Sequence, residues 1–463
     1  MAMLNDWPWR YWARETPQGV ALIEENTRWS WPQAAERINQ LAAGFEQQGV
    51  KPGCGVALRG KNSGTMLFCY LALLQCGARL LPLNPQLPES LTLPLLRSLD
   101  VTYGLCLSGQ PWPSGIAALR HETAEPLSCR PVQPWRPERL ATLTLTSGSS
   151  GAPKAAAHTF AAHLASAEGV LDMMPFTAGD SWLLSLPLFH VSGQGIVWRW
   201  LASGATLAVR VRQPLEFALQ GCTHASLVPT QLWRLLSKNS VPVALKAVLL
   251  GGAMIPQELV RQAEACGVSC WCGYGLTELA STVCAKRADG RAGVGVPLRG
   301  REIRLAGEEV LLRGSTLASG YWRDGRLFPL VDDEGWFHTR DRGCFVDGEW
   351  RILGRLDNQF FSGGEGIQPE NIESLLLTHP DVQQACVVPV DDAEFGQRPA
   401  AVVEITGAAT LDDLRNWLSP QLAGFQRPVA YYHLAAELKN NGIKISRRQV
   451  QAWVDSKSNQ QKG

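Results

Sequence analysis

The residues from Thr146 to Lys154, which read TSGSSGAPK, have the types and spacing of a loop that holds a polyphosphate. The glycines permit backbone angles and a close approach to an anion that a side chain would prevent. The hydroxyl side chains can donate hydrogen bonds, and the final lysine supplies positive charge. The residues expected to contact phosphate are Thr146, Ser147, Gly148, Ser149, Ser150, Gly151 and Lys154. The alternative interpretation is a solvated Gly/Ser turn.

The flanking segments predict how this loop is positioned. Leu140 to Thr146 alternates apolar and hydroxyl residues, which is typical of a half-buried strand. From Ala155 onward the chain is rich in alanine, with apolar residues at helical spacing, which predicts a helix. We therefore expect a strand-to-helix loop with Lys154 at the helix start, where the helix dipole favours anions. The loop is not a Walker A motif, because Pro153 and Ala155 stand where that motif has glycine and Ser or Thr.

Three later motifs carry further polar chemistry. His190 follows an expected strand and opens a helix, although a histidine in such a place is often structural. In Tyr-Gly-Leu-Thr-Glu, the ring of Tyr274 can stack on a base, Thr277 offers a hydroxyl to phosphate, and Glu278 is a hard oxygen ligand suited to Mg²⁺. A strand followed by a glycine turn would give the same pattern. Asp341, when ionised, can accept hydrogen bonds on both carboxylate oxygens. The alternative interpretation of its motif is a surface turn.

The composition limits the class of protein. At 463 residues the chain exceeds one ordinary domain, and its hydrophobic share of 45% fits a full globular core. The formal net charge of +1 argues against general attachment to nucleic acid or to an anionic membrane. We expect no signal peptide, because the start MAMLNDWPWR has no apolar core of the required length. We expect no integral membrane segment, because the most apolar stretch, Met66 to Leu83, is short and contains Gln75 and Arg79. That stretch instead predicts a buried helix followed by a strand.

The cysteines indicate a cytoplasmic protein with reduced thiols. The chain has 12 of them, scattered and mostly in apolar surroundings. Cys270 and Cys272 form a Cys-x-Cys pair without a matching second pair, which disfavours a zinc site.

The order of the patterns predicts a mixed α/β fold. Short apolar runs, such as those that begin at Val56 and Ala247, alternate with helical patterns such as Glu89 to Leu99 and Gln257 to Ala265. Between about 294 and 346, short strands and glycines predict a small barrel or an antiparallel sheet.

The pattern becomes mixed again after Gly354, which places an expected domain boundary between Gly354 and Asp357. The expected elements there are a helix at 369–378, a strand at 384–390, a helix at 411–418 and a polar tail at the end. The resulting domains cover residues 1–354 and 355–463, and the second has the common size of about one hundred residues.

The order of residues in these motifs resembles the acyl-adenylate-forming enzymes, a superfamily that includes acyl-CoA synthetases, luciferases and peptide-synthetase adenylation domains. The resemblance implies a large N-terminal domain of two α/β sheets with a small β-barrel-like subdomain, and a smaller, mobile α+β C-terminal domain. It also implies ATP, CoA and Mg²⁺ as ligands, with Glu278 as the metal ligand and His190, Thr277, Glu278 and Lys444 as catalytic residues. The ATP-binding residues that it adds to those of the loop are Gly252, Gly273, Tyr274, Gly275, Thr277, Asp341, Arg355 and Lys444.

The resemblance extends into the C-terminal part of the chain. Asp357, in Gly-Arg-Leu-Asp, matches the hinge of these enzymes, and the segment Ser362, Gly363 and Gly364 matches the part that borders the pantetheine channel of CoA. Lys444 is assigned to the mobile catalytic lysine because Ile-x-Arg follows it, although Ile443 adds one residue to the usual Gly-Lys-Ile register. Lys439 is the competing candidate.

The chain resembles one family within this superfamily, the bacterial 2-succinylbenzoate–CoA ligases of menaquinone biosynthesis. The resemblance extends over the longer segments 189–201, 223–235, 362–369 and 438–447. Their substrate is a dicarboxylate, so one carboxylate is activated and the other needs a cation. We assign that cation to Arg199, with a snorkelling surface arginine as the alternative. The other expected pocket residues are His190, Ser192, Thr230 and Gly251.

Other functions stay open at this point. They are another aryl- or fatty-acyl-CoA ligase, a carrier-protein-loading module, and a non-catalytic nucleotide binder. The sequence also leaves open the oligomeric state, a homo-oligomer included.

Overall fold

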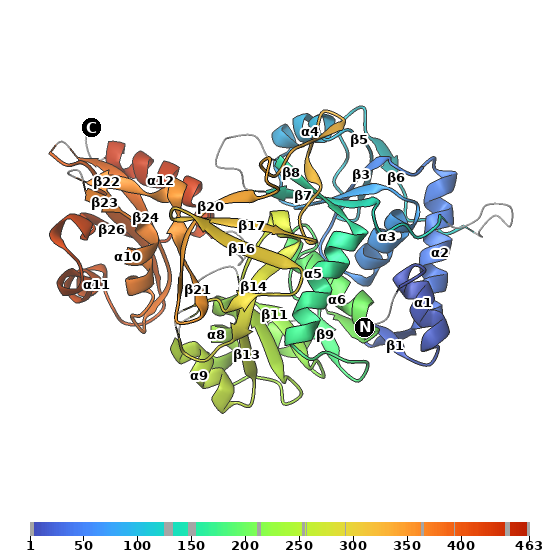
Figure 1. Ribbon diagram of the computed structural model, residues 1–463, viewed down its shortest axis with the longest axis horizontal. Coiled ribbons are helices and arrows are strands. Elements are labelled where there is room, and N and C mark those ends of the chain that lie inside the picture. The colour runs from blue at the N-terminus through green and yellow to red at the C-terminus, as the bar shows by residue number, and fades with distance from the viewer. Residues whose placement is uncertain are drawn as a thin grey trace.

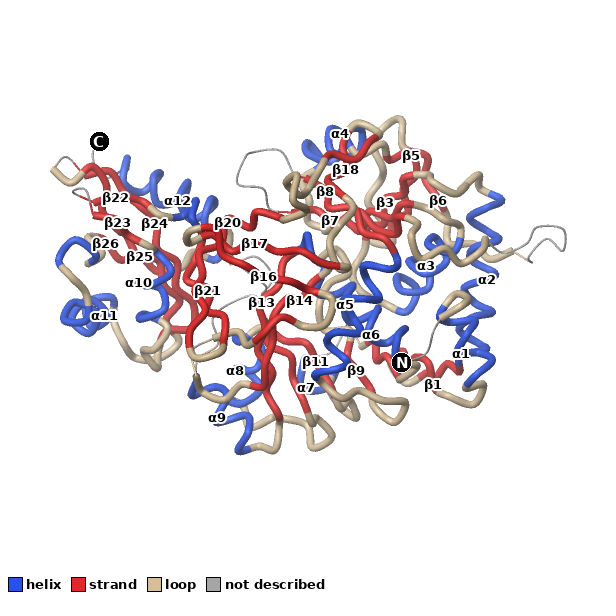
Figure 2. The backbone as a smooth tube through the Cα atoms, viewed as in Figure 1, coloured by secondary structure: helices blue, strands red, loops and turns tan. Residues whose placement is uncertain are grey.

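The computed structural model of the protein describes residues 4–124, 133–146, 154–210, 214–251, 255, 257–291, 293–362, 365–392, 394–439 and 445–460. These residues form four β-sheets and the helices that cover them (Figure 1). Figure 2, which colours strands red and helices blue, shows a small sheet between the large N-terminal part and the C-terminal sheet. This arrangement agrees with the mixed α/β architecture expected from the sequence.

The first large sheet has eight strands, and its central strands are parallel. In spatial order these strands are β19 (Arg326–Phe328), β18 (Gly320–Arg323), β8 (Lys154–Thr159), β7 (Leu140–Thr146), β4 (Arg79–Leu83), β3 (Gly55–Arg59), β5 (Val101–Cys106) and β6 (Ala117–Leu119). Strand β8 is antiparallel to both of its neighbours, β7 and β18.

The second large sheet has nine strands, of which six consecutive ones are parallel. In spatial order the strands are β15 (Val296–Pro297), β14 (Ser281–Arg287), β13 (Ser269–Leu276), β12 (Ala247–Leu250), β11 (His224–Leu227), β9 (Ser181–Leu183), β10 (Thr206–Val209), β1 (Val20–Glu24) and β2 (Thr27–Ser30). The carboxyl ends of β11 and β12 and the middle of β13 therefore meet along one edge.

Helices fill the space between the two large sheets and cover their outer faces. The inner layer packs against both sheets in one apolar core and consists of α1 (Pro8–Glu15), α2 (Trp31–Gln47), α3 (Gly64–Gln75), α5 (Phe160–Met173) and α6 (Val191–Ser203). The outer helices are α4 (Glu89–Ser98) on the eight-stranded sheet, and α7 (Leu215–Ala218), α8 (Pro229–Ser237) and α9 (Gln257–Ala265) on the nine-stranded sheet. Hydroxyl side chains start the long inner helices: Ser30, Ser63 and Thr159 each accept a backbone N–H of the first turn.

A four-stranded antiparallel sheet follows, so the glycine-rich region forms the antiparallel alternative expected from the sequence. Its strands are β16 (Arg301–Ala306), β17 (Glu309–Gly314), β20 (Phe337–Val346) and β21 (Glu349–Arg355). Its apolar face packs on Leu279, in the turn between β13 and β14, and on Val283 of β14. This turn contains the short 3₁₀ helix η1 (Thr277–Leu279).

The C-terminal sheet is covered on both faces by helices. Its strands are β23 (Glu365–Ile367), β22 (Phe360–Ser362), β25 (Gly396–Ile405), β24 (Val382–Asp392) and β26 (Ala430–His433). Along β25, Ala401 and Val403 face α10 (Pro369–Leu376) and α11 (Leu411–Leu418), whereas Ala400 and Val402 face α12 (Arg447–Gln460). This alternation follows from the period of two of a strand. The chain passes from the four-stranded sheet to the C-terminal sheet between β21 and β22, through the 3₁₀ helix η2 (Leu356–Asn358).

Two local expectations are wrong. The alanine-rich segment after Lys154 does not begin as a helix: Lys154–Thr159 is strand β8, and α5 starts at Phe160. Sheet pairing on both sides overrides the helix propensity of the alanines, whose small side chains are completely buried. The polar end of the chain was expected as a tail, but α12 continues through it to Gln460. Among the described helices, none is long and apolar enough to cross a membrane.

Candidate functional site

The predicted phosphate loop joins two antiparallel strands. Thr146 ends β7 and pairs in register with Lys154, which starts β8, so the loop is a strand-to-strand connection at the sheet edge. The strand-to-helix expectation, and the helix-dipole argument for Lys154, are therefore wrong. Lys154 is exposed, with its Nζ 5.1 Å from the centre of the Tyr321 ring. Ser147, Gly148, Ser149, Ser150 and Gly151 lie outside the described residues, as do Gly252, Gly363, Gly364 and Lys444.

Glu278 lies beyond the end of β13, on η1, and its carboxylate is oriented by a tyrosine. The Tyr321 hydroxyl donates a hydrogen bond of 2.8 Å to Oε1 of Glu278, and the backbone N–H of Ala318 donates to the Glu278 carbonyl at 2.8 Å. Burial, with the Glu278 charge next to it, raises the pKa of Tyr321, so the hydroxyl stays a donor at working pH. Lys154, Tyr321 and Glu278 thus form one row from the loop to the η1 turn.

Tyr274, Asp341 and Arg355 form a second cluster beside this row. The Tyr274 hydroxyl donates to Oδ2 of Asp341, and Nη1 of Arg355 lies 3.3 Å from Oδ1 of the same carboxylate. Asp341 is buried in β20, so the surface-turn interpretation of its motif is wrong. Arg355 also reaches Asp357 through Nε, at 2.9 Å, and Nη2, at 3.2 Å. Strand β13 connects the two clusters, because it carries Tyr274 and η1 with Glu278 follows directly beyond its end.

Glycines let this part of β13 approach the neighbouring strand closely. A side chain at Gly275 would collide with the carbonyl oxygen of Ser281. Gly273 is the preceding glycine of the motif, and a Cβ there would lie 3.0 Å from the carbonyl oxygen of Cys284. Packing within the sheet therefore requires glycine at position 275, whereas at position 273 it leaves little room for a side chain.

The other pocket candidates lie where neighbouring strands end. Gly251 follows β12, and its N–H donates to the Leu227 carbonyl at 3.4 Å at the end of β11. Thr230 lies in the first turn of α8, which starts just beyond β11, and is half-buried. Parallel strands place their carboxyl-terminal residues on one edge, so these two positions are close in space.

His190 and Ser192 lie at the start of α6. His190 is the N-cap residue of this helix, as the sequence predicted, and its ring packs on Phe189 with 4.6 Å between ring centres. The side chain is exposed, yet the surrounding protein lowers the pKa of its imidazole through partial desolvation. Ser192 is half-buried in the first turn.

Arg199 lies farther along α6, in the interior. Its side chain is 3% exposed, so the surface-arginine alternative is wrong. Nε donates to the Gly195 carbonyl at 2.8 Å, and the guanidinium lies over the Trp182 ring at 4.5 Å. Nη1 is buried without a hydrogen-bond partner, and Arg199 forms no ion pair within the described residues. Burial lowers the pKa of this guanidinium to about 9, which marks a charge that lacks compensation.

Two further candidates from the sequence, Ser362 and Lys439, lie in the C-terminal part. Ser362 is buried at the end of β22, and its hydroxyl has no hydrogen-bond partner among the described residues. Lys439 is ion-paired with Glu404 at 2.7 Å, which gives this lysine a structural role of its own. Gln368 links the last two sheets, because it accepts from Nη1 of Arg342 at 3.1 Å and donates to the Arg355 carbonyl at 3.0 Å.

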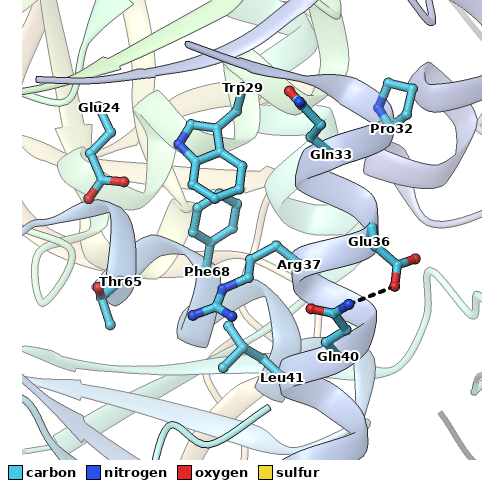
Figure 3. A pocket seen from close by; sticks show the side chains of 10 residues that line it. All are labelled: Glu24, Trp29, Pro32, Gln33, Glu36, Arg37, Gln40, Leu41, Thr65 and Phe68. Carbon is cyan, nitrogen blue, oxygen red and sulfur yellow. Dashed lines mark hydrogen bonds between the residues drawn. The ribbon is translucent and has the colours of Figure 1, made fainter. Parts of the chain in front are cut away.

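A hollow on the surface lies apart from this site. This groove of about 620 Å³ lies between β2, α2 and α3. Figure 3 shows Trp29 and Phe68 among the side chains that line it, and the centres of their rings are 4.9 Å apart. None of the residues expected from the sequence lines it.

The sequence analysis missed Tyr321. The Gly-Tyr-Trp segment that contains it looked like a strand of the small region, but β18 joins the eight-stranded sheet beside β8. Pairing between strands so far apart in the chain leaves no local signal in the sequence.

Comparison with known proteins agrees with this geometry. The model for AMP-binding enzymes matches residues 9–322, and that for the AMP-binding enzyme C-terminal domain matches residues 371–444. The 2-succinylbenzoate–CoA ligase of Salmonella typhimurium is 58% identical over 97% of this chain and 98% of its own length. The chain belongs to the AMP-binding enzymes, in the family of the 2-succinylbenzoate–CoA ligases. The family resemblance drawn from the motifs is thereby confirmed, as is the expected class of AMP-forming acyl-CoA synthetases.

Solved structures of this family share the fold. A single-substitution variant of Escherichia coli MenE with bound OSB-AMS is 53% identical, with a TM-score of 0.93 over 98% of this chain and 99% of that one. The o-succinylbenzoate CoA synthetase of Bacillus subtilis is 25% identical, with a TM-score of 0.87 over 96% of this chain. It has been solved with ATP and magnesium ion, covering 99% of that chain, and with the acyl-adenylate intermediate OSB-AMP, covering 98%.

Proposed function

We propose that this protein is an ATP-dependent acid–thiol ligase of menaquinone biosynthesis. It converts 2-succinylbenzoate, ATP and CoA to 2-succinylbenzoyl-CoA, AMP and pyrophosphate. The observation that carries the choice of acid is the buried Arg199 guanidinium, which has no carboxylate partner among the described residues. A substrate with a second carboxylate would supply that partner, whereas a benzoate or a fatty acid would leave the charge uncompensated.

The reaction proceeds in two displacements. In the first, an oxygen of the substrate carboxylate attacks the α-phosphorus of ATP, the bond to pyrophosphate breaks, and an acyl-adenylate forms. In the second, the CoA thiol loses its proton and attacks the acyl carbon, and the bond to AMP breaks. No covalent protein nucleophile is needed, so the side chains act by positioning and by stabilising charge.

We assign a separate task to each residue of the site. Asp341 accepts hydrogen bonds from the ribose, Tyr274 packs at the base, and the loop from Thr146 to Lys154 holds the phosphates that leave. His190 lies between nucleotide and acyl group. Lys444 contributes charge to the first displacement only.

Magnesium fits the site as a companion of ATP. Mg²⁺ usually keeps several waters and takes one or two protein carboxylates together with substrate phosphates. Within the described residues no group of three or more His, Cys, Asp or Glu side chains could hold a metal. Glu278 would be the protein ligand, with one carboxylate oxygen held by the Tyr321 hydroxyl. When bound, the ion neutralises charge on the phosphates.

Rotation of the C-terminal part about Asp357 separates the two displacements. It withdraws Lys444 and brings the segment from Ser362 to Gly364 to the CoA channel. A cytoplasmic location fits the eleven described cysteines, all of which are free thiols.

The test uses the purified protein with ATP, Mg²⁺, CoA and a panel of carboxylic acids, and identifies the thioesters by mass spectrometry. The expected preferred acid is 2-succinylbenzoate; preference for benzoate or a fatty acid would overturn the choice. Lys444→Ala tests the mechanism, because it should abolish adenylation and spare thioester formation from preformed acyl-adenylate. Equal loss of both half-reactions would refute that role.

A further inference from the structure

The backbone just after Glu278, at Ala280 and Ser281, has an unfavourable conformation. Ala280 and Ser281 have φ angles of 51° and 111°, in the left-handed region that residues other than glycine rarely adopt. Two such residues in succession persist only where their surroundings hold them in place. They immediately follow the η1 turn that carries Thr277 and Glu278, and the Ala280 N–H donates back to the Thr277 carbonyl at 3.2 Å.

Ser166, on the inner helix α5, forms a hydrogen bond to this turn. The Ser166 hydroxyl donates a hydrogen bond of 2.7 Å to the Ala280 carbonyl, and both residues are buried. The two partners are 114 residues apart in the chain, so this bond ties the turn to a separate element. It satisfies a carbonyl that the left-handed conformation turns away from the sheet ladder.

Arg301 holds the serine and the strand beyond the turn. It lies at the start of β16 and is 6% exposed. Nη2 donates to Oγ and to the carbonyl oxygen of Ser166 at 3.2 and 3.0 Å, and Nε donates to the Thr282 carbonyl at 3.1 Å. Nη1 donates to the carbonyls of Arg299 and Ala165 at 2.8 and 3.3 Å.

Every one of these acceptors is a neutral oxygen. The guanidinium is therefore used as a rigid fork with five donors, which a lysine cannot replace. Gly169 on α5 makes room for it, because a Cβ there would collide with Nη1. The hydrogen bonds from Arg301 through Ser166 to Ala280 polarise one another in this buried setting.

We propose that Ser166 and Arg301 are positioning residues for Glu278. They lock the turn of Ala280 and Ser281 that follows η1, while the Tyr321 hydroxyl contacts the carboxylate itself, and so fix the direction of the Glu278 carboxylate. Release of the lock lets the turn relax toward ordinary φ angles and rotates the carboxylate away from its place. This inference rests on the proposed function, in which Glu278 is the protein ligand of Mg²⁺·ATP.

The variants separate positioning from plain stability. Ser166→Ala removes the hydroxyl, Ser166→Thr keeps it, and Arg301→Lys removes the fork but keeps the charge. The matched control is Thr206→Val, which removes another hydrogen bond of a buried hydroxyl, of 2.8 Å to the Val20 carbonyl, on strand β10, which three strands separate from β13. The surface variant Arg299→Lys is the control for the exchange of an arginine for a lysine, because Arg299 pairs with Glu168 and Asp172 near Arg301.

The first measurement is equilibrium binding of ATP to the full chain by calorimetry, with Mg²⁺ varied and with neither acid nor CoA present. Ser166→Ala and Arg301→Lys should raise the Mg²⁺ concentration for half-maximal ATP binding by about tenfold, because a small displacement of a ligand has large effects. Ser166→Thr should restore the wild-type value. Melting temperatures are recorded for every variant, and Thr206→Val should have a lower melting temperature than the wild type but the same Mg²⁺ requirement.

The second measurement is thioester formation from preformed acyl-adenylate, which needs no ATP. Its rate should be unchanged in the folded Ser166→Ala protein. An unchanged Mg²⁺ requirement in Ser166→Ala, or an equal rise in Thr206→Val, would overturn the inference. Neither outcome depends on which acid the wild-type enzyme prefers, so failure of the proposed substrate is detected separately, in the acid panel.

Discussion

The hydroxyl of Tyr274 donates a hydrogen bond to Oδ2 of Asp341, and this bond joins the nine-stranded sheet to the four-stranded sheet. Arg355 occupies the other carboxylate oxygen, so both oxygens of Asp341 are oriented before any ligand binds. Burial and the neighbouring Asp341 charge raise the pKa of Tyr274 well above its ordinary value, which keeps the hydroxyl protonated. The tyrosine thus acts on the aspartate as well as offering its ring.

Tyr274→Phe should therefore raise the KM for ATP by about fivefold, because Asp341 loses one of its orienting donors while the ring stays in place. The KM for CoA should stay the same. Steady-state kinetics with each substrate varied in turn checks this. Tyr103→Phe is the matched control, because it also loses one hydroxyl hydrogen bond, of 3.0 Å to the Gly49 carbonyl. A similar rise in its KM for ATP would contradict a specific role for Tyr274.

Arg199→Met should separate stability from substrate binding. The buried guanidinium is uncompensated within the described residues, so its replacement by an apolar side chain of similar length should leave the melting temperature of the ligand-free enzyme unchanged or raise it. The KM for 2-succinylbenzoate should rise about a hundredfold, because the second carboxylate loses its partner.

Arg199→Lys refines this prediction. A lysine keeps the charge but loses the bidentate fork, so the KM for 2-succinylbenzoate should rise far more than the KM for ATP. Thermal melting and steady-state kinetics test both variants. Equal rises in the two KM values, or a large loss of melting temperature in Arg199→Met, would show that Arg199 is structural.

The sequence motifs were good guides to which residues gather in the site. His190 occupies the N-cap position of α6, Tyr274, Asp341 and Arg355 contact one another, and Glu278 lies just beyond the strand that carries Tyr274. Each motif depends on a short run of residues around a turn or strand end, where local chemistry determines the structure. Helices α9 and α11 match their expected bounds for the same reason, because their apolar spacing is regular.

Partners from distant parts of the chain could not be predicted. The alanines of β8 favour a helix locally, and only pairing with β18 makes them a strand. The same pairing brings Tyr321 to Glu278, and Arg301 reaches Ser166 across 135 residues. Such contacts depend on the assembled sheets, so no window of sequence contains them.

Asp357→Pro should uncouple the two half-reactions. Proline fixes φ near −65° and removes an N–H, so a residue that must change its backbone angles during rotation cannot do so. The rates of adenylation and of thioester formation should then fall by factors that differ at least about tenfold, since one orientation is kept and the other is lost.

Asp357→Ala is the control for this hinge variant. It removes the ion pair with Arg355, of 2.9 Å, but leaves the backbone free. Its two half-reactions should change by similar factors. Single-turnover measurement of each half-reaction decides the matter, and equal losses in Asp357→Pro would place the hinge elsewhere.

The buried histidine pair behind the site should make the fold sensitive to acid. His158 and His163 have ring centres 5.1 Å apart, and neither is exposed by more than 1%. Burial lowers the pKa of His158 to about 4, against a smaller opposite effect from the backbone of Thr277 and Glu278. Burial also lowers the pKa of His163 well below its ordinary value, and the neighbouring His158 adds to this.

The direction of the pH effect follows from proton binding. Between pH 6.5 and about 4 the unfolded chain binds protons on these rings and the folded chain does not, so stability falls as the pH falls through this window. His158 alone contributes a loss of about 3 kcal/mol across it, from about 1.4 kcal/mol for each pH unit. The stabilisation is fully present above pH 6.5.

Urea unfolding of the wild type and His158→Gln at pH 7, 6 and 5 tests this prediction. The variant should have a shallower fall in the free energy of unfolding with decreasing pH, by about 1 kcal/mol for each unit, because one proton-binding difference is removed. The exposed His433 offers the control, and His433→Gln should keep the wild-type slope. ATP binds to the folded protein and not to the unfolded chain, so acid unfolding removes its site. Loss of ATP binding should therefore accompany acid unfolding, and parallel slopes for the wild type and His158→Gln would exclude His158 as the responsible group.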